Sequence, residues 1–328
     1  MKKTLTIIAL SLTGFLTFAQ QDAQFSMNMF NRLSVNPAYA GTNEALCATL
    51  FYRQQWTNFP GAPKTGLLSV DYGNILHGGV GLTVDQDQLG FDKTFAAKAA
   101  YSFHYILGNG MLCAGLDLGV MQKSLTGNFI APDGTSTNTS NGIDPAIPWN
   151  GAKTTTYDVG FGLYYTLPNK LYVGLSSDHL PDQTMKKSGS TTIPAFGTTP
   201  AHTYPWNYDY KYARHYYIMA GYTFQLGEMY DLTPSILAKS DASSTQLDIN
   251  AIARWNKMVF LGASYRLSDA VVAIVGLEWQ GFKFGYSYDI TMSDIKKYSN
   301  GTHEIMLGYC HKFIPPVKKH GHMNERFL

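Results

Sequence analysis

Residues 93–107 read KTFAAKAAYSFHYIL, a stretch in which apolar and polar side chains alternate along the chain. Every odd-numbered position from Phe95 to Leu107 carries an apolar or aromatic side chain. After Lys93, the polar residues occupy even-numbered positions: Thr94, Lys98, Ser102 and His104. Successive side chains of a β-strand point to opposite faces of the sheet, so this period predicts a strand with one apolar and one polar face.

The same alternation recurs along the chain and predicts fourteen strands. They lie near residues 44–57, 64–74, 78–86, 93–107, 112–120, 157–165, 170–179, 212–226, 231–239, 244–255, 258–267, 270–279, 282–290 and 302–313. Most of their charged residues fall opposite the apolar face: Asp71, Asp85, Asp178, Lys239, Asp248, Arg254, Arg266, Glu278, Lys283, Asp289, Glu304 and Lys312. Arg214 and His311 break this rule, and each lies near a strand end. A charge facing lipid at mid-membrane costs about 2–4 kcal/mol, so the separation favours strands that contact a bilayer.

The connections differ between the two sides of the predicted sheet. Those after the second, fourth, sixth, eighth, tenth and twelfth strands are tight, such as Gly108-Asn109-Gly110. The long connections, residues 122–153 and 180–211, both lie on the other side. Outer-membrane barrels have short periplasmic turns and longer extracellular loops. The sequence therefore predicts an all-β protein, a transmembrane antiparallel β-barrel of about 14 strands in a bacterial outer membrane.

The two predicted faces lead to an expectation about substitutions. Leu116→Arg and Leu163→Arg would turn a charge toward lipid and should impair assembly. Asp117→Asn and Gly162→Ser, each one position away, change the inner face and should be tolerated much better.

The start of the chain has the pattern of a secretory signal peptide. Lys2 and Lys3 form a positive region, an uncharged and mostly apolar stretch follows, and Ala19 offers a small residue for cleavage. The apolar stretch is shorter than the roughly 20 residues of a spanning helix. Residues 1–19 are therefore predicted to be a signal peptide that is removed on export.

The rest of the chain divides into three parts. Residues 20–43 form an N-terminal segment, periplasmic or lumenal, residues 44–313 form the barrel, and residues 314–328 form a periplasmic tail. Gly79 and Gly81 lie on the predicted inner face. Glycine inside a strand suggests close backbone approach, here of a plugging segment.

Composition excludes one large class of function. Without Lys2 and Lys3, the 25 basic residues fall to 23, equal to the 23 acidic ones, whereas nucleic-acid binders are basic. No nucleic-acid partner is expected. The three cysteines, Cys47, Cys113 and Cys310, cannot form a full disulfide framework. We expect them to be small packed residues of the strands.

No sequence motif indicates catalysis. The chain has neither a Gly-x-Ser-x-Gly nucleophile elbow nor a His-Glu-x-x-His zinc motif. His320 and His322 lie in the C-terminal tail, where histidines are usually solvated. We therefore expect no enzyme activity, no cofactor and no metal, although a Ser/His/acid cluster at the barrel rim would point to a hydrolase.

Aromatic residues in the two long connections form a candidate partner-binding surface. They are Trp149, Tyr204, Trp206, Tyr208 and Tyr210. Tyr and Trp are enriched at the energetic centres of protein interfaces. The alternative, which the sequence leaves open, is that these residues pack over the barrel mouth or belong to the aromatic girdle.

Several motifs occur in a fixed order along the chain. The first are Gln24-Phe25-Ser26-x-x-Met29-Phe30-Asn31 and Asn36-Pro37-Ala38-Tyr39-Ala40-Gly41. Later ones are Tyr52-Arg53-x-x-Trp56, Gly61-Ala62-Pro63-x-Thr65, Arg214-His215-Tyr216-Tyr217, Gly221-Tyr222, Pro234-Ser235, Gly262-x-Ser264-Tyr265-Arg266, Gly285-Tyr286-Ser287-Tyr288-Asp289 and Gly301-x-His303-Glu304. In this set the chain resembles the PorP/SprF family, although its two long connections match no pattern of that family.

The resemblance implies an outer-membrane protein of the type IX secretion system and gliding machinery of Bacteroidota. Its implied role is non-enzymatic: assisting export or cell-surface attachment of partner proteins. The implied partners are outer-membrane lipid, secreted or surface-attached cargo and periplasmic secretion components. The alternative function is a passive channel or small-solute transporter of the outer membrane, which an open, water-filled lumen would favour.

Overall fold

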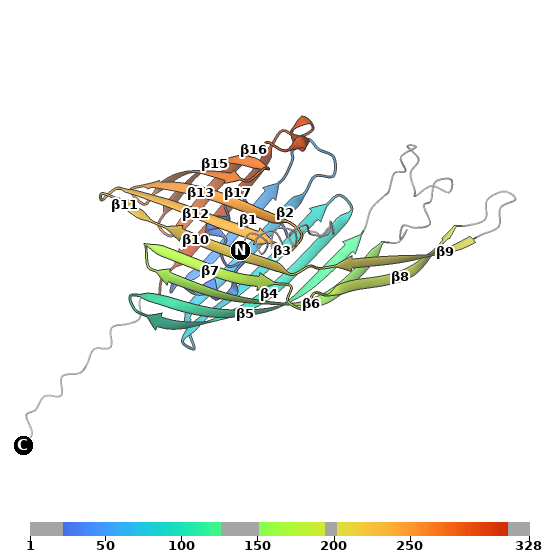
Figure 1. The fold of residues 1–328 in the computed structure, drawn as a ribbon, viewed down its shortest axis with the longest axis horizontal. Coiled ribbons are helices and arrows are strands. Elements are labelled where there is room, and N and C mark those ends of the chain that lie inside the picture. The colour runs from blue at the N-terminus through green and yellow to red at the C-terminus, as the bar shows by residue number, and fades with distance from the viewer. Residues whose placement is uncertain (1–21, 126–150, 194–201, 314–328) are drawn as a thin grey trace, which may run out of the picture.

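The computed structural model describes residues 22–125, 151–193 and 202–313 as an antiparallel β-barrel (Figure 1). Its strands are β1 (Leu46–Gln54), β2 (Lys64–Ile75), β3 (Gly78–Leu89), β4 (Asp92–Leu107), β5 (Gly110–Leu125), β6 (Ala152–Leu167), β7 (Leu171–Asp178), β10 (His215–Tyr222), β12 (Tyr230–Ser240), β13 (Thr245–Trp255), β14 (Val259–Arg266), β15 (Ala270–Trp279), β16 (Phe282–Thr291) and β17 (Thr302–His311). Each strand pairs with the next, β1 pairs with β17, and β10 pairs with β12 to close the circle. The predicted barrel of fourteen strands is confirmed.

The described residues contain no helix with the length and apolarity that a membrane crossing requires.

The two faces of the wall follow the predicted parity. Leu50 and Leu116 are each 47% exposed on the outside, and aromatic residues such as Phe103 lie with them. Arg53 and Glu304, from β1 and β17, are 1% and 0% exposed inside the barrel. Because lipid provides no counter-charge or hydrogen bond, the alternation places the polar side chains in the lumen.

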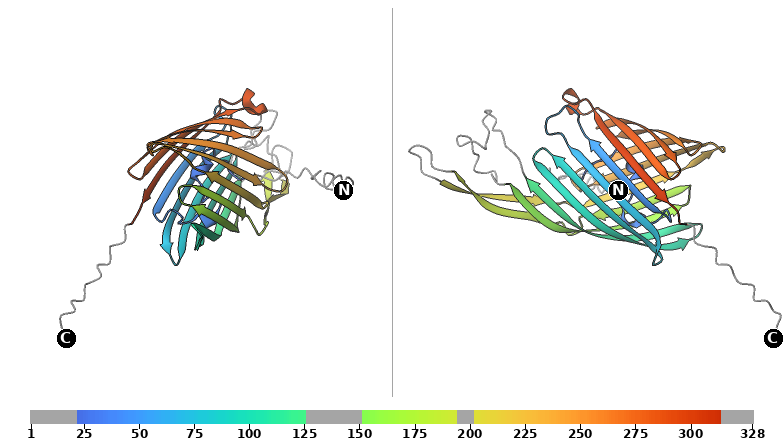
Figure 2. Two further views of the ribbon diagram at one scale, coloured as in Figure 1. Left: turned by 60° about the vertical axis from the view of Figure 1, so that its left-hand side comes forward. Right: turned by 180° about the vertical axis from the view of Figure 1, so that it is seen from behind.

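The connection between β7 and β10 differs from the expected loop. It contains β8 (Thr184–Ile193) and β9 (His202–Lys211), which pair as an antiparallel hairpin. Figure 2 shows this hairpin extending beyond the barrel wall on the side of the long connections. Alternating aromatics in 204–210 were the signal for β9, but their position between two barrel strands made a loop the simpler interpretation. A further short strand, β11 (Phe224–Leu226), pairs with β12 beside the turn after β10.

The expectation for the cysteines was wrong for two of the three. Cys47 of β1 and Cys310 of β17 lie opposite each other in the pairing of these strands and form a disulfide. They are 263 residues apart in the sequence. Only closure of the barrel, which joins the first strand to the last, brings them together. Cys113 is free and buried, as expected.

Residues 22–43 run inside the barrel, and we call them the lumen segment. They contain two short 3₁₀ turns, η1 (Asn28–Phe30) and η2 (Pro37–Tyr39). The first half packs its apolar side chains with those of the wall in a cluster that includes Met27, Phe51 and Phe260. The second half packs in another cluster, which includes Ala38, Tyr164 and Tyr217. The lumen is therefore filled largely by the protein's own chain.

Candidate functional site

The lumen segment contacts two different surfaces of the barrel interior. We call the first the ionic wall, defined by Arg53, Asp248, Arg266, Asp289 and Glu304 of β1, β13, β14, β16 and β17. We call the second the glycine wall, defined by Gly79, Gly81, Gly115, Gly162 and Gly174 of β3, β5, β6 and β7. These strands lie in separate halves of the barrel.

Ser26 of the lumen segment lies at the centre of the ionic wall. Its Oγ donates to Asp289 Oδ2 at 2.6 Å and accepts from Arg53 Nη1 at 2.7 Å. Its backbone N–H and that of Met27 donate to the two oxygens of Glu304, each at 2.8 Å. Arg53 itself pairs with Asp289 at 2.9 Å and with Glu304 at 3.0 Å. The segment thus supplies donors and an acceptor that this buried charge network uses.

Arg266 and Asp248 extend the network. Arg266 lies 3.3 Å from both Asp248 and Asp289 and also donates to Ser26 Oγ at 3.2 Å. Asp248 Oδ2 accepts from the side-chain amides of Gln24 and Asn28 at 3.1 and 3.0 Å. Burying an unpaired charge is expensive, and removing one partner of a buried pair typically costs about 3–5 kcal/mol. Withdrawal of the segment would therefore leave buried polar groups without partners.

The second half of the segment is held mostly through its own backbone and the side chain of Asn36. Asn36 caps η2, because its Oδ1 accepts from the backbone N–H of Ala38 at 2.9 Å. Its Nδ2 donates to the carbonyl of Leu163 at 3.0 Å. Ser102 Oγ donates to the carbonyl of Ala38 at 2.8 Å, and Asp71 accepts from the N–H of Gly41. This half of the segment therefore contacts β6, β4 and β2 mainly through its backbone.

The glycine wall makes room for that backbone. A Cβ on Gly79 would collide with the carbonyl of Ala40, and one on Gly115 would meet the backbone of Ala38. The expectation that Gly79 and Gly81 allow close approach of a plugging segment is confirmed. A Cβ on Gly162 would collide with Asn36 Oδ1. The structure therefore contradicts the expected tolerance of Gly162→Ser, because parity alone does not reveal what fills the lumen.

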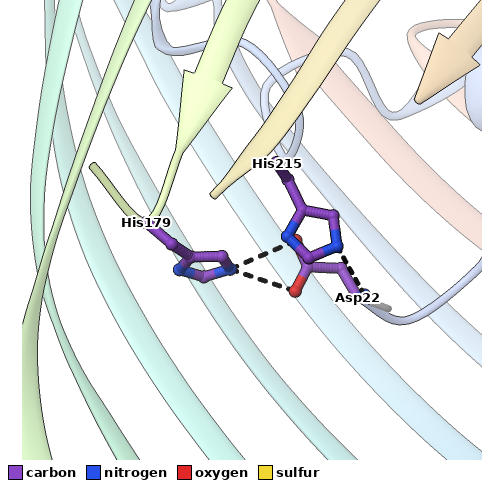
Figure 3. A group of neighbouring side chains, drawn as sticks. All are labelled: Asp22, His179 and His215. Carbon is purple, nitrogen blue, oxygen red and sulfur yellow. Dashed lines mark hydrogen bonds and ion pairs between the residues drawn. The ribbon is translucent and has the colours of Figure 1, made fainter. Parts of the chain in front are cut away.

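The end of the segment near the base of the hairpin is held by two histidines (Figure 3). Asp22 Oδ1 lies 3.0 Å from His179 Nε2, and the Asp22 N–H donates to His215 Nε2 at 3.4 Å. Burial by itself favours the neutral forms of Asp22 and His179, because it raises the pKa of the carboxyl and lowers that of the imidazole. The imidazoles of His179 and His215 nevertheless hold the pKa of Asp22 well below its usual range. Despite burial, the carboxylates of Asp22 and Asp158 raise the pKa of His179 to about 10.

Beside Asp22 the structure contains a cavity of about 160 Å³. Its lining includes acidic, basic and phenolic side chains: Asp85, Asp87, Lys98, Tyr210, Tyr212 and Tyr217. Lys98 is paired with Asp158 at 2.8 Å and with Asp178 at 3.2 Å. The cavity is thus a small space of mixed polar and apolar lining between the lumen segment and the base of the hairpin.

The aromatic residues chosen from the sequence are found in one strand, with one exception. Tyr204, Trp206, Tyr208 and Tyr210 lie in β9 at alternate positions, and Trp149 is outside the described residues. The side chains of Trp206, Tyr208 and Tyr210 are half-buried on one face of the hairpin. The Tyr210 ring lies 3.8 Å from Lys123 Nζ and lines the cavity. Tyr210 therefore packs at the barrel mouth.

Sequence reasoning did not single out the ionic wall as a site. Each of its residues had been assigned to the inner face or to a motif, and Ser26, Arg53, Arg266, Asp289 and Glu304 all belong to the motifs quoted above. The sequence did contain an indication of it, because both acidic and basic residues fall on the predicted inner face. Buried charges need partners, and the segment before β1 was the nearest source.

The closed antiparallel wall, the apolar outer face and the polar lumen define an outer-membrane β-barrel. Solved structures of other barrels share the fold, among them the two that follow, and both resemblances are of the fold alone. One is the CymD monoaromatic hydrocarbon channel, with 11% identity, a TM-score of 0.52 and coverage of 86% of this chain and 92% of that one. The other is the Ralstonia pickettii toluene transporter TbuX, with 11% identity, a TM-score of 0.50 and coverage of 85% and 92%. No curated protein sequence matches.

Residues 17–309 match the family described as type IX secretion system membrane protein PorP/SprF, and the chain belongs to that family. Family and fold are those of a secretion-system outer-membrane barrel and not of an enzyme class.

Proposed function

We propose that this barrel assists the export or cell-surface attachment of partner proteins in the type IX secretion and gliding machinery, without catalysing a reaction. The long connections, including the β8–β9 hairpin, face outward and bind the partner. The short turns face the periplasmic components of the system. Membership of the PorP/SprF family supports the assignment to this system.

The observation that carries the proposal is the hairpin that projects beyond the barrel. Its backbone is outside the ring of paired wall strands, so it can change without breaking the closed ladder. One face of β9 presents Trp206 and Tyr208, half-buried, and the other presents Asn207 and Asp209, exposed. Together with Tyr204 and Trp149, Trp206 and Tyr208 form the proposed partner surface, and Tyr210 packs at its base. Loss of a central aromatic anchor typically costs an interface about 2 kcal/mol or more.

The occupied lumen supports attachment over conduction. A passive channel needs a continuous water-filled path, whereas the lumen segment fills the barrel from the glycine wall to the ionic wall. The cavity of about 160 Å³ beside Asp22 is small compared with the passage that an unfolded polypeptide needs. A barrel closed by its own chain therefore fits a receptor or anchor better than a pore.

The test compares two faces of the same strand in living cells. Trp206→Ser with Tyr208→Ser removes the aromatic face, and Asn207→Ser with Asp209→Ser is the matched control. Surface levels of secreted proteins are measured in both strains and in a strain without the gene. We expect the aromatic variant, but not the control, to lose the same surface proteins as the deletion strain.

The proposal fails if the aromatic variant inserts normally and keeps every surface protein that the gene deletion removes. A tag inserted at Asn138 tests the orientation separately and should be accessible on intact cells. A tag at Asn109, in a short turn, should not be accessible. External labelling of the Asn109 tag would reverse the orientation.

A further inference from the structure

We infer that Asp22, His179 and His215 form a site for a zinc-like divalent cation that ties the lumen segment to the base of the hairpin. One ligand atom from each residue can be chosen so that all three lie within 4.8 Å of one another. Both histidines are buried, with 3% and 1% of their surface exposed. Two imidazoles and one carboxylate are the ligand types that zinc takes in proteins.

The distances require only small movements to bind a metal. Ligand atoms around a tetrahedral zinc are roughly 3.3 Å apart, given Zn–N and Zn–O bonds of about 2.0–2.1 Å. Asp22 Oδ1 is already 3.0 Å from His179 Nε2. Asp22 Oδ2 is 3.8 Å from His215 Nδ1. Figure 3 shows the three side chains converging from the segment, from the residue after β7 and from the start of β10.

Each proposed ligand has a partner that fixes its orientation, as metal ligands usually do. Asp158 Oδ2 lies 2.9 Å from His179 Nδ1, which leaves Nε2 toward Asp22. The carbonyl of Ala213 lies 3.0 Å from His215 Nδ1, and His215 Nε2 accepts from the backbone N–H of Asp22 at 3.4 Å, a long hydrogen bond that a cation on Nε2 would replace. Tyr217 donates to Asp22 Oδ2 at 2.8 Å.

The lysines nearby leave the Asp22 carboxylate to the histidines. Lys98 pairs with Asp158 and Asp178. Lys239 donates to the backbone carbonyl of Asp22, at 3.1 Å, rather than to its carboxylate. The Asp22 carboxylate is therefore approached by His179, His215 and Tyr217.

The position of the trio gives the metal a structural consequence. His179 follows β7 and precedes the hairpin, and His215 begins β10 just after it. A cation shared with Asp22 would hold both ends of the hairpin against this end of the lumen segment. This inference does not rest on the proposed partner binding, because it concerns only the ligands and the metal.

The experiment measures zinc bound by the full-length protein, purified in detergent without a histidine tag. His320→Gln and His322→Gln are introduced in every sample, so that the C-terminal histidines contribute nothing. After equilibration with buffered zinc, bound metal is determined by mass spectrometry. We expect His179→Ala, His215→Ala and Asp22→Asn to lose the zinc that the parent binds. His77→Ala, in an exposed turn, should keep it.

Asp158→Asn should retain the ligands but weaken zinc affinity about 10–100-fold, as loss of an orienting carboxylate usually does. Heat-modifiable migration on gels checks that each barrel is folded. If the histidine variants fail to fold, Asp22→Asn decides the matter, because Asp22 lies outside the barrel wall. The inference is overturned if the parent binds no zinc, or if Asp22→Asn binds zinc as tightly as the parent.

Discussion

The two halves of the barrel interior hold the same segment by opposite means. The ionic wall uses buried charges, with Ser26 between Arg53 and Asp289. The glycine wall uses an absence of side chains, so that the backbone of residues 36–41 lies directly on the strands. The ionic wall binds the segment because its buried charges are costly to leave unpaired. The glycine wall binds the segment because it leaves space for the backbone, and a single added Cβ would remove that space. The position of the segment is therefore fixed by two independent sets of contacts. Each set can be tested by substitutions that leave the other unchanged.

The largest effect is expected from Arg53→Met in the ionic wall. It leaves Asp289 and Glu304 without their closest cation and should destabilise the closed lumen by about 3–5 kcal/mol. Hydrogen exchange at the backbone amides of residues 26 and 27 should rise sharply. Lys170→Met is the control, because Lys170 is exposed in a short turn. Unchanged protection in the Arg53 variant would mean that the charges do not hold the segment.

Gly115→Val should have the next largest effect, in the glycine wall. Its side chain would occupy the place of the Ala38 backbone, and overpacking of this kind costs about 1–3 kcal/mol. Exchange should increase at residues 36–41 more than at residue 26. Gly66→Val is the matched control, since nothing lies within 4 Å of a Cβ built on Gly66. If Gly115→Val and Gly66→Val increased exchange equally, the increase would come from replacing a glycine in a β-strand and not from contact with the segment.

Asn36→Ala is expected to have the smallest effect of the three. It removes the cap of η2 and the bonds from Nδ2 to the carbonyls of β6 and β7. Loss of such a cap typically costs about 0.5–2 kcal/mol. The melting temperature should fall less than in the Arg53 variant. Ser34→Ala, which loses only a local bond to Asn31, serves as the control. If Asn36→Ala lowered the melting temperature more than Arg53→Met, the ranking of the two walls would be reversed.

The strands and their faces could be predicted because a bilayer enforces a strict two-residue period. Leu116 outside and Asp117 inside are consequences of that period, and the structure agrees with both. The β8–β9 hairpin was missed because no membrane constrains it, so its alternation competes with an ordinary loop. The approach of the segment to Gly79 was predictable, since an unexplained inner glycine needs a reason.

The contacts within the lumen could not be predicted in the same way. Ser26, Arg53, Asp289 and Glu304 come from four distant segments, and their meeting depends on the barrel closing in one register. The bond between Cys47 and Cys310 has the same cause. Parity places a residue on a face but does not say which residue faces it across the lumen. For that reason Gly162→Ser appeared harmless from the sequence alone.

The most direct test of a lumen closed by residues 22–43 is ion conductance of the purified protein in planar lipid bilayers. The wild-type barrel should show no sustained conductance, because the segment is bound to both walls. A variant with Arg53→Met and Gly115→Val together should conduct, since it weakens both. A large, steady conductance from the wild-type protein, unchanged in the double variant, would contradict the account.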